Sequence, residues 1–129
     1  MSAIEVRPIV EMAADILSDP ERWTQGSAAR DIRGTSVGCE SPEACTFCAA
    51  GALGRAAFLL GGSTYPSYTN FGGATNALAK ALQMLKTASL ARYDLAPQLV
   101  NDGPDPVAAY RQVLALYQDV LRRQQEVDS

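Results

Sequence analysis

The sequence predicts a mainly α-helical fold, a single-domain bundle of four or five helices that spans residues 1–129. Two observations lead to this prediction. Apolar residues recur every three or four positions in several separate stretches, which is the spacing of an amphipathic helix. The chain is also 47% hydrophobic and only 19% charged, so at this length it can bury a hydrophobic core without disulfides or a structural metal.

The first helix is predicted from Pro8 to Leu17, where proline occupies the permitted first turn and apolar residues follow at helical spacing. It should end at Asp19, because the residue before a proline is pushed out of the helical region. Small and polar residues then dominate. They predict a short β-hairpin near residues 27–37, although a bare loop would explain the same composition.

A second helix is predicted from Ser41 to Gly61. Its start carries a serine cap, then Pro42 at the first position, then Glu43 at the positive end of the helix dipole. Two glycines, Gly61 and Gly62, mark its end. Many of its residues are alanine or glycine, so neighbouring helices are expected to approach it closely.

The third helix is predicted from Ala74 to Lys86, because leucines recur there at intervals of four and three. A short helix is expected to follow, beginning near Tyr93 or Asp94. The stretch from Asn101 to Pro104 has the composition of a turn.

The final helix is predicted to start at Asp105, an N-cap followed by a first-turn proline. Its apolar residues cover about half of the helix circumference. Such a wide face packs against two neighbouring helices, or against the core on one side and a second chain on the other. The second alternative predicts a homodimer through this helix. The apolar residues are Val107, Tyr110, Val113, Leu114, Leu116, Tyr117, Val120 and Leu121.

Residues 61–73 form a candidate flexible or binding loop. The sequence carries no charge from Ala56 to Ala79, and within this loop aromatic residues alternate with glycine, serine, threonine and asparagine. Rigid aromatic rings beside adaptable hydrogen-bonding groups are typical of binding loops, while an exposed connection without a partner is the alternative. The candidate binding residues are Tyr65, Tyr68, Asn70 and Phe71.

The absence of histidine removes several classes of enzyme. Without imidazole the chain has no Ser-His or Cys-His nucleophile pair and no Cys/His zinc site. The net charge of −3 and the lack of clustered basic residues argue against binding to nucleic acid or to anionic membranes. We see no secretory leader and no apolar stretch of membrane-spanning length, which predicts a cytoplasmic protein.

Three cysteines lie close together in the sequence. Cys45 and Cys48 have the C-x-x-C spacing of redox dithiols and of half a zinc site, and Cys39 could add a third sulfur. A structural zinc site needs four ligands, and only Glu40, Glu43 or water could supply the fourth. The structural alternative treats Cys48 as a small apolar residue packed in the second helix.

A second candidate cluster lies in the least regular segment. Trp23, Gln25 and Arg30 combine an aromatic ring with amide and guanidinium groups, which could bind a small polar ligand. Alternatively, Trp23 anchors the loop to the core and Arg30 fixes the hairpin.

The chain resembles a family of small uncharacterised proteins from bacteria and their phages. The resemblance rests on W-T-x-G at Trp23, A-R-D-x-x-G at Ala29, C-x-x-G-A-L at Cys48 and an asparagine-aspartate turn at Asn101. It implies a fold but no activity or cofactor, and it adds Asn101 and Asp102 to the candidate binding residues. This chain has Val100 where an aromatic residue commonly precedes the asparagine.

These observations predict a non-enzymatic protein-binding module without a cofactor. We expect this module to be phage-derived and to inhibit or regulate a host protein, whose identity the sequence does not disclose. The alternative is a small zinc-binding or thiol-redox protein that uses Cys45 and Cys48.

Overall fold

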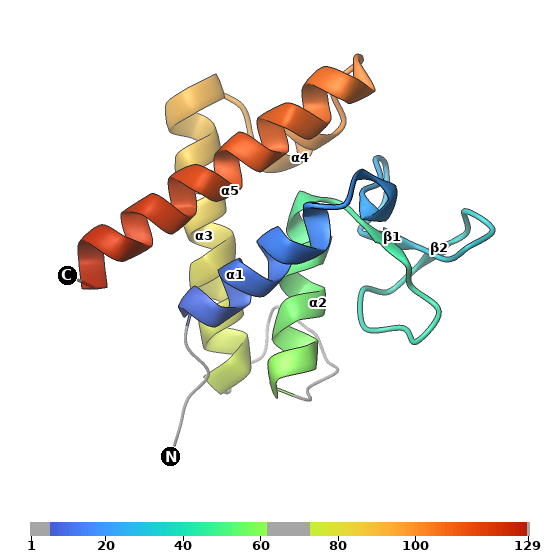
Figure 1. Ribbon diagram of the computed structural model, residues 1–129, viewed down its shortest axis with the longest axis horizontal. Helices are drawn as coiled ribbons and strands as arrows, with labels where there is room; N and C mark the ends of the chain where they lie inside the picture. The colour runs from blue at the N-terminus through green and yellow to red at the C-terminus, as the bar shows by residue number, and fades with distance from the viewer. Residues whose placement is uncertain (1–5, 62–72, 129) are drawn as a thin grey trace.

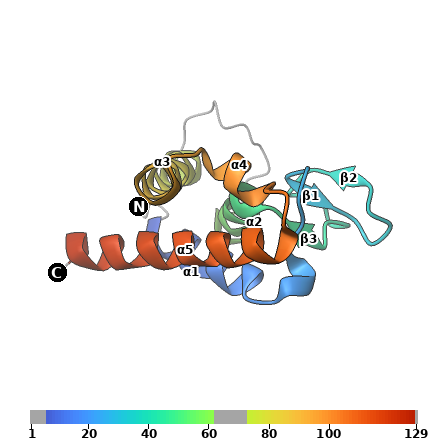
Figure 2. The same ribbon diagram turned by 90° about the horizontal axis from the view of Figure 1, so that it is seen from above.

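Two layers of helices enclose the core. In this computed structural model, α1 and α5 pack across α2 and α3, and the short helix α4 joins α3 to α5 (Figure 1, Figure 2). The prediction of a mainly helical single domain is therefore confirmed, with five α-helices in the described part of the chain, residues 6–61 and 73–128. The helices are α1 (Val6–Leu17), α2 (Ala49–Gly61), α3 (Gly73–Tyr93), α4 (Pro97–Asn101) and α5 (Pro106–Asp128).

Helix α1 buries the face that its sequence predicts. Ile9, Val10 and Leu17 are completely buried against the other helices. The helix ends at Leu17, and Asp19 then caps a single 3₁₀ turn, η1 (Pro20–Arg22), by accepting a hydrogen bond from the N–H of Glu21.

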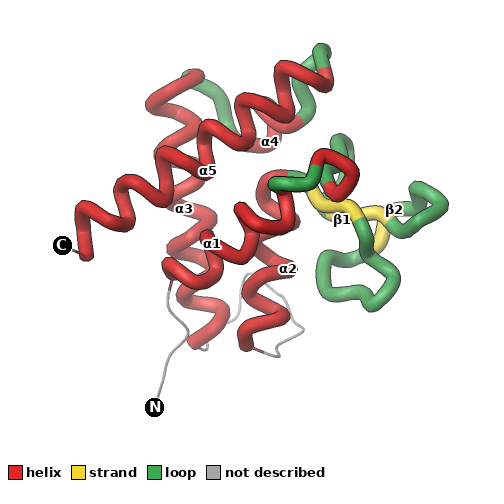
Figure 3. The backbone as a smooth tube through the Cα atoms, in the orientation of Figure 1, coloured by secondary structure: helices red, strands yellow, loops and turns green. Residues whose placement is uncertain are grey.

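A small antiparallel sheet lies beside the start of α2 (Figure 3). Strand β1 (Ala29–Arg30) is central, and β2 (Ser36–Val37) and β3 (Thr46–Phe47) pair with it on either side. Strands β1 and β2 form the hairpin predicted near residues 27–37. The third strand was not predicted.

The predicted start of the second helix at Ser41 is wrong, because α2 begins at Ala49. The serine side chain does accept a hydrogen bond from the N–H of Glu43, but the result is an isolated turn. Farther along, the N–H of Cys45 donates to the carbonyl of Arg30. The chain up to β3 therefore pairs with β1, which overrides the local capping signal.

Helix α3 continues beyond the predicted end at Lys86 and takes in residues assigned to the next helix. It ends at Tyr93, and Asp94 follows in the left-handed region with φ 58°. The predicted start of the short helix near Tyr93 or Asp94 is therefore wrong. Helix α4 begins at Pro97, whose ring suits the first helical position.

Helix α5 starts where the sequence predicts. The carboxylate of Asp105 accepts hydrogen bonds from the N–H groups of Val107 and Ala108. The wide apolar face packs against three helices of the same chain, α1, α3 and α4. One predicted member of this face is misplaced, because Val107 is 61% exposed.

Within the described ranges, no helix combines the length and the apolar character needed to cross a membrane.

Candidate functional site

The buried side chain of Asn101, at the end of α4, joins distant parts of the chain. Its Oδ1 accepts hydrogen bonds from Trp23 Nε1 at 2.7 Å and from the N–H of Ala49 at 3.0 Å. Its Nδ2 donates to the carbonyl of Thr24 and to Asp102 Oδ1, both at 3.0 Å. We call these five residues the Asn101 hub. Because a primary amide offers two donors and two principal acceptor positions, the side chain of Asn101 is saturated.

Trp23 anchors the hub to the helical core. Its ring lies 5.4 Å from the ring of Tyr110 on α5, with the two planes tilted by 54°. The hydroxyl of Tyr110 in turn donates to the carbonyl of Leu17 at the end of α1. Trp23 therefore serves the anchoring role that the sequence left as one alternative.

Trp23 and the three residues after it cross the turn between α4 and α5. The side-chain amide of Gln25 donates to the carbonyls of Asn101 and Gly103, both at 2.9 Å. The N–H of Gly26 donates to Asp102 Oδ1 at 2.9 Å, and Gly26 adopts φ 80°, which glycine tolerates best. We call residues 23–26 the strap.

Arg30 holds the strap and the hairpin together. Its guanidinium donates to Thr24 Oγ1 at 3.2 Å, to the carbonyl of Gln25 at 3.1 Å and to the carbonyl of Gly34 at 2.9 Å. The structure thus brings Trp23, Gln25 and Arg30 close together. Their side-chain N–H groups donate hydrogen bonds to other residues of the same chain.

The start of α2 fits tightly against the strand side of the hub. The N–H of Cys48 donates to the carbonyl of Ala28 at 3.1 Å. A Cβ atom on Gly51 would lie 1.9 Å from that same carbonyl oxygen. Only glycine therefore allows β1 and α2 to approach this closely.

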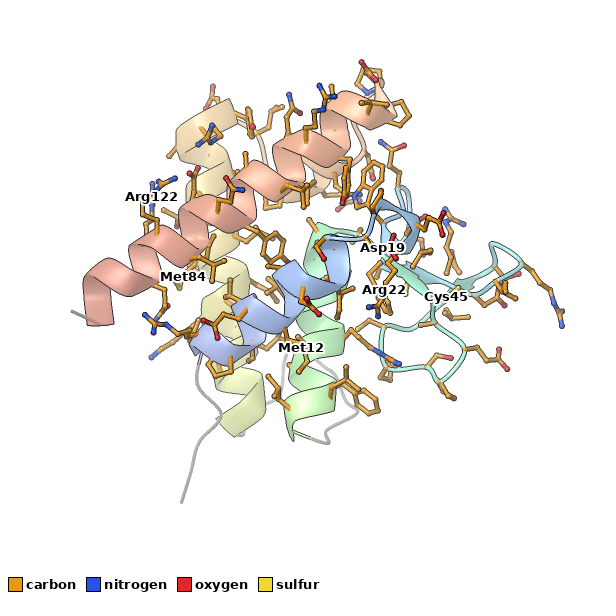
Figure 4. All side chains as sticks on the ribbon, in the orientation of Figure 1. Met12, Asp19, Arg22, Cys45, Met84 and Arg122 are labelled. Carbon is orange, nitrogen blue, oxygen red and sulfur yellow. The ribbon has the colours of Figure 1, made fainter. Side chains whose placement is uncertain are left out.

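The cysteines occupy three different settings. Cys48 is half-buried at the N-cap of α2, where its Sγ accepts a hydrogen bond from the N–H of Gly51 at 3.2 Å. Cys45 precedes β3, among the strand and loop segments of Figure 4. Both cysteines therefore precede α2, whereas the helix predicted from Ser41 would have contained them, and Cys48 is not a fully buried core residue.

Burial also sets the chemistry of two thiols. It raises the pKa of Cys48 above its ordinary value, and it raises the pKa of Cys39 to about 11 with help from the nearby charge of Glu40. Both thiols are therefore protonated at neutral pH, which disfavours nucleophilic attack. In the part of the chain that the structure describes, we find no group of three cysteine, aspartate or glutamate side chains placed to hold a metal ion.

A small pocket of about 190 Å³ opens beside the hub. Its walls come from the segment that follows the strap, the start of α2 and helix α4. Pockets for drug-sized ligands span roughly 300–1,000 Å³, so this pocket is small for a metabolite. Polar or ionisable side chains in its wall are those of Ser27, Cys48, Gln98, Asn101 and Asp102.

Sequence reasoning missed a second polar cluster, which ties α3 to α5. Asp119 is 7% exposed and accepts two hydrogen bonds from Arg92, at 2.7 and 2.9 Å, and one from Arg122 at 2.9 Å. The hydrogen bonds from Arg92 have the largest effect on Asp119 and, with the one from Arg122, lower its pKa to about 2. The i, i+3 spacing of Asp119 and Arg122 was the only signal for it in the sequence.

The remaining predicted binding residues, Tyr65, Tyr68, Asn70 and Phe71, lie outside the described residues. Their role in binding stays a prediction.

Comparison with known proteins gives one match. A family model described as a family of unknown function (DUF6197) matches residues 1–127. No curated protein and no solved structure matches the chain. The motifs at Trp23, Ala29, Cys48 and Asn101, which carried the family resemblance, all contribute to the hub or its immediate support.

Proposed function

We propose that this chain, which belongs to the DUF6197 family of unknown function, is a non-enzymatic protein-binding module, phage-derived, that inhibits or regulates a host protein. One observation carries the proposal. Of the seven large apolar side chains that are exposed in the described part of the chain, three come from one short segment. They are Leu95, Leu99 and Val107, with exposed fractions of 43%, 59% and 61%.

The inner side of α4 is packed against the rest of the chain. Val100 and Asn101 are buried on the inner side of α4, whereas their neighbour Leu99 points outward. We call the exposed side chains of residues 94–107 the α4 surface. A surface fixed before binding loses little conformational entropy on association, so its apolar contacts contribute more of their free energy to affinity.

The Asn101 hub supports the proposal in a second way, because its polar groups are already occupied. Catalysis needs groups that are free to exchange protons or to attack a substrate. The amide of Asn101 and the indole N–H of Trp23 are already committed to internal hydrogen bonds. The polar residues that the family motifs share therefore support the fold, and recognition falls to the exposed apolar residues.

Of two further expectations from the sequence, the proposal keeps one and sets the other aside. The loop at residues 61–73 keeps its predicted contribution to binding through Tyr65, Tyr68 and Phe71. A homodimer through the final helix is less favoured, because three helices of the same chain already cover most of the apolar face of α5. We therefore propose a different protein as the main partner.

The proposal is tested by quantitative affinity capture from the native cells. The baits are the wild-type chain, Leu99→Asp and a matched control, Ile32→Asp, in which the residue replaced is 90% exposed on the distant hairpin. We expect wild type and control to capture the same protein and Leu99→Asp to lose it at least about tenfold. Circular dichroism and thermal melting establish that all three chains are folded. Equal capture by all three would refute the proposal.

A further inference from the structure

The α4 surface is acidic as well as apolar. Asp94, Asp102 and Asp105 are all exposed on it, and no lysine or arginine occurs from residue 93 to residue 110. The same stretch carries Leu95, Leu99 and Val107. The surface thus combines three apolar anchors with three carboxylates.

Two of the three aspartates accept hydrogen bonds from backbone N–H groups, which do not neutralise them. Asp105 caps α5, Asp102 accepts a hydrogen bond from the N–H of Gly26, and Asp94 ends α3 in the left-handed region. Backbone N–H groups carry no net charge. These contacts therefore fix the carboxylates of Asp102 and Asp105 without removing their charge.

Two arginines flank this surface in the sequence, Arg92 and the exposed Arg111. Arg92 pairs with Asp119 on α5 through two hydrogen bonds. Arg30 donates to acceptors in the strap and hairpin. Residues 93–110 themselves carry three negative charges and no positive charge, so the surface is acidic between Arg92 and Arg111.

We propose that the α4 surface binds a protein segment that presents lysine or arginine beside apolar anchor residues. This inference rests on the proposed protein-binding function and names the chemistry of the partner. Opposite charges around an apolar contact speed association and exclude like-charged competitors, while the apolar residues supply most of the affinity. An acidic rim around leucine and valine therefore selects a basic amphipathic segment.

The test uses two matched synthetic peptides with leucine on one helical face and either lysine or glutamate on the other. Binding to the isotope-labelled full chain is followed by amide chemical shifts. The test variant carries Asp94→Asn, Asp102→Asn and Asp105→Asn, because asparagine keeps an acceptor oxygen at Asp102, suits the N-cap position and tolerates the left-handed region. The control variant loses the same number of charges elsewhere, at the exposed residues Glu11, Glu21 and Glu43, each replaced by glutamine.

We expect the lysine peptide to bind, to shift the amides of residues 94–107, and to bind the test variant at least about tenfold more weakly than the control variant. The glutamate peptide should not bind. Shifts located elsewhere, equal weakening in both variants, or no binding of the lysine peptide would each overturn the inference. A native partner that requires Leu99 but not the three aspartates would leave the binding function standing and refute only this inference. Peptide binding without any native partner would refute the proposed function instead.

Discussion

The two sides of α4 use the same five-residue helix in opposite ways. On the inner side, the polar side chain of Asn101 is 1% exposed and saturated with hydrogen bonds. On the outer side, Leu99 is 59% exposed and lies outside the core. The usual distribution of polar and apolar residues is thus reversed at these two positions of one short helix.

This reversal separates the residues that make the fold from those available to a partner. A buried polar group without its hydrogen bonds costs free energy, so the hub must be complete for the chain to fold. An exposed leucine costs little and stabilises nothing in the free chain. The inner side should therefore control stability, and the outer side should control binding.

The largest expected effect is that of Asn101→Ala. It would leave the indole N–H of Trp23, the N–H of Ala49 and the carbonyl of Thr24 without their partner. At about 1–3 kcal/mol for each unsatisfied buried group, with partial access of water, we expect a loss of about 4 kcal/mol in the free energy of unfolding. Urea denaturation followed by circular dichroism measures it.

The matched control for this prediction is Leu99→Ala on the outer side of α4. It should change the free energy of unfolding by no more than about 0.5 kcal/mol. Equal losses from the two substitutions would abolish the contrast between the two sides.

A somewhat smaller effect is expected from Gly51→Ala. The new Cβ would meet the carbonyl oxygen of Ala28 at 1.9 Å, and backbone atoms on both sides must move apart. We expect a loss of about 3 kcal/mol in the free energy of unfolding. In Gly54→Ala the new Cβ meets the sulfur of Cys39 at 2.6 Å, and because a side chain can rotate, the loss should be smaller. The reverse order would show that β1 and α2 do not pack as described.

A smaller loss of stability than at Asn101 or Gly51 is expected at Asp119, because its two arginine partners are about half exposed. Arg92 and Arg122 are 43% and 59% exposed, so water screens the pairs, and Asp119→Asn should cost about 1 kcal/mol at pH 7. The pKa of Asp119 falls from 3.8 to about 2 on folding. Its stabilising contribution is therefore present above about pH 4 and disappears as the pH falls towards about 2.

Denaturation curves of wild type and Asp119→Asn between pH 2 and pH 7 test this dependence. The difference between the two should narrow below about pH 4. A difference that stays constant with pH would mean that the ion pairs contribute nothing measurable.

Local signals in the sequence were sufficient to predict most helix boundaries. Pro20 ends the first helix and Asp105 caps the last, because both effects act over a few residues. The same kind of signal failed at Ser41. There, the pairing of β3 with β1 outweighed a correct cap, and no local pattern records that pairing.

The candidate site was predictable only in part, because its contacts span the chain. The family motifs named Trp23 and Asn101, but they are 78 positions apart in sequence, and only the fold brings them together. The sequence also placed Val107 in the apolar face of α5. Its exposure follows from where α4 ends and α5 begins, which helical periodicity does not encode.

The central claim is that the outer side of α4 is the surface a partner covers. A photo-activated crosslinking residue at position 99, expressed in the native cells, tests this most directly, with the same residue at position 118, which is exposed on α5, as the matched control. We predict one prominent crosslinked protein from position 99 and none from position 118. No product from position 99, or the same products from both positions, would contradict the account.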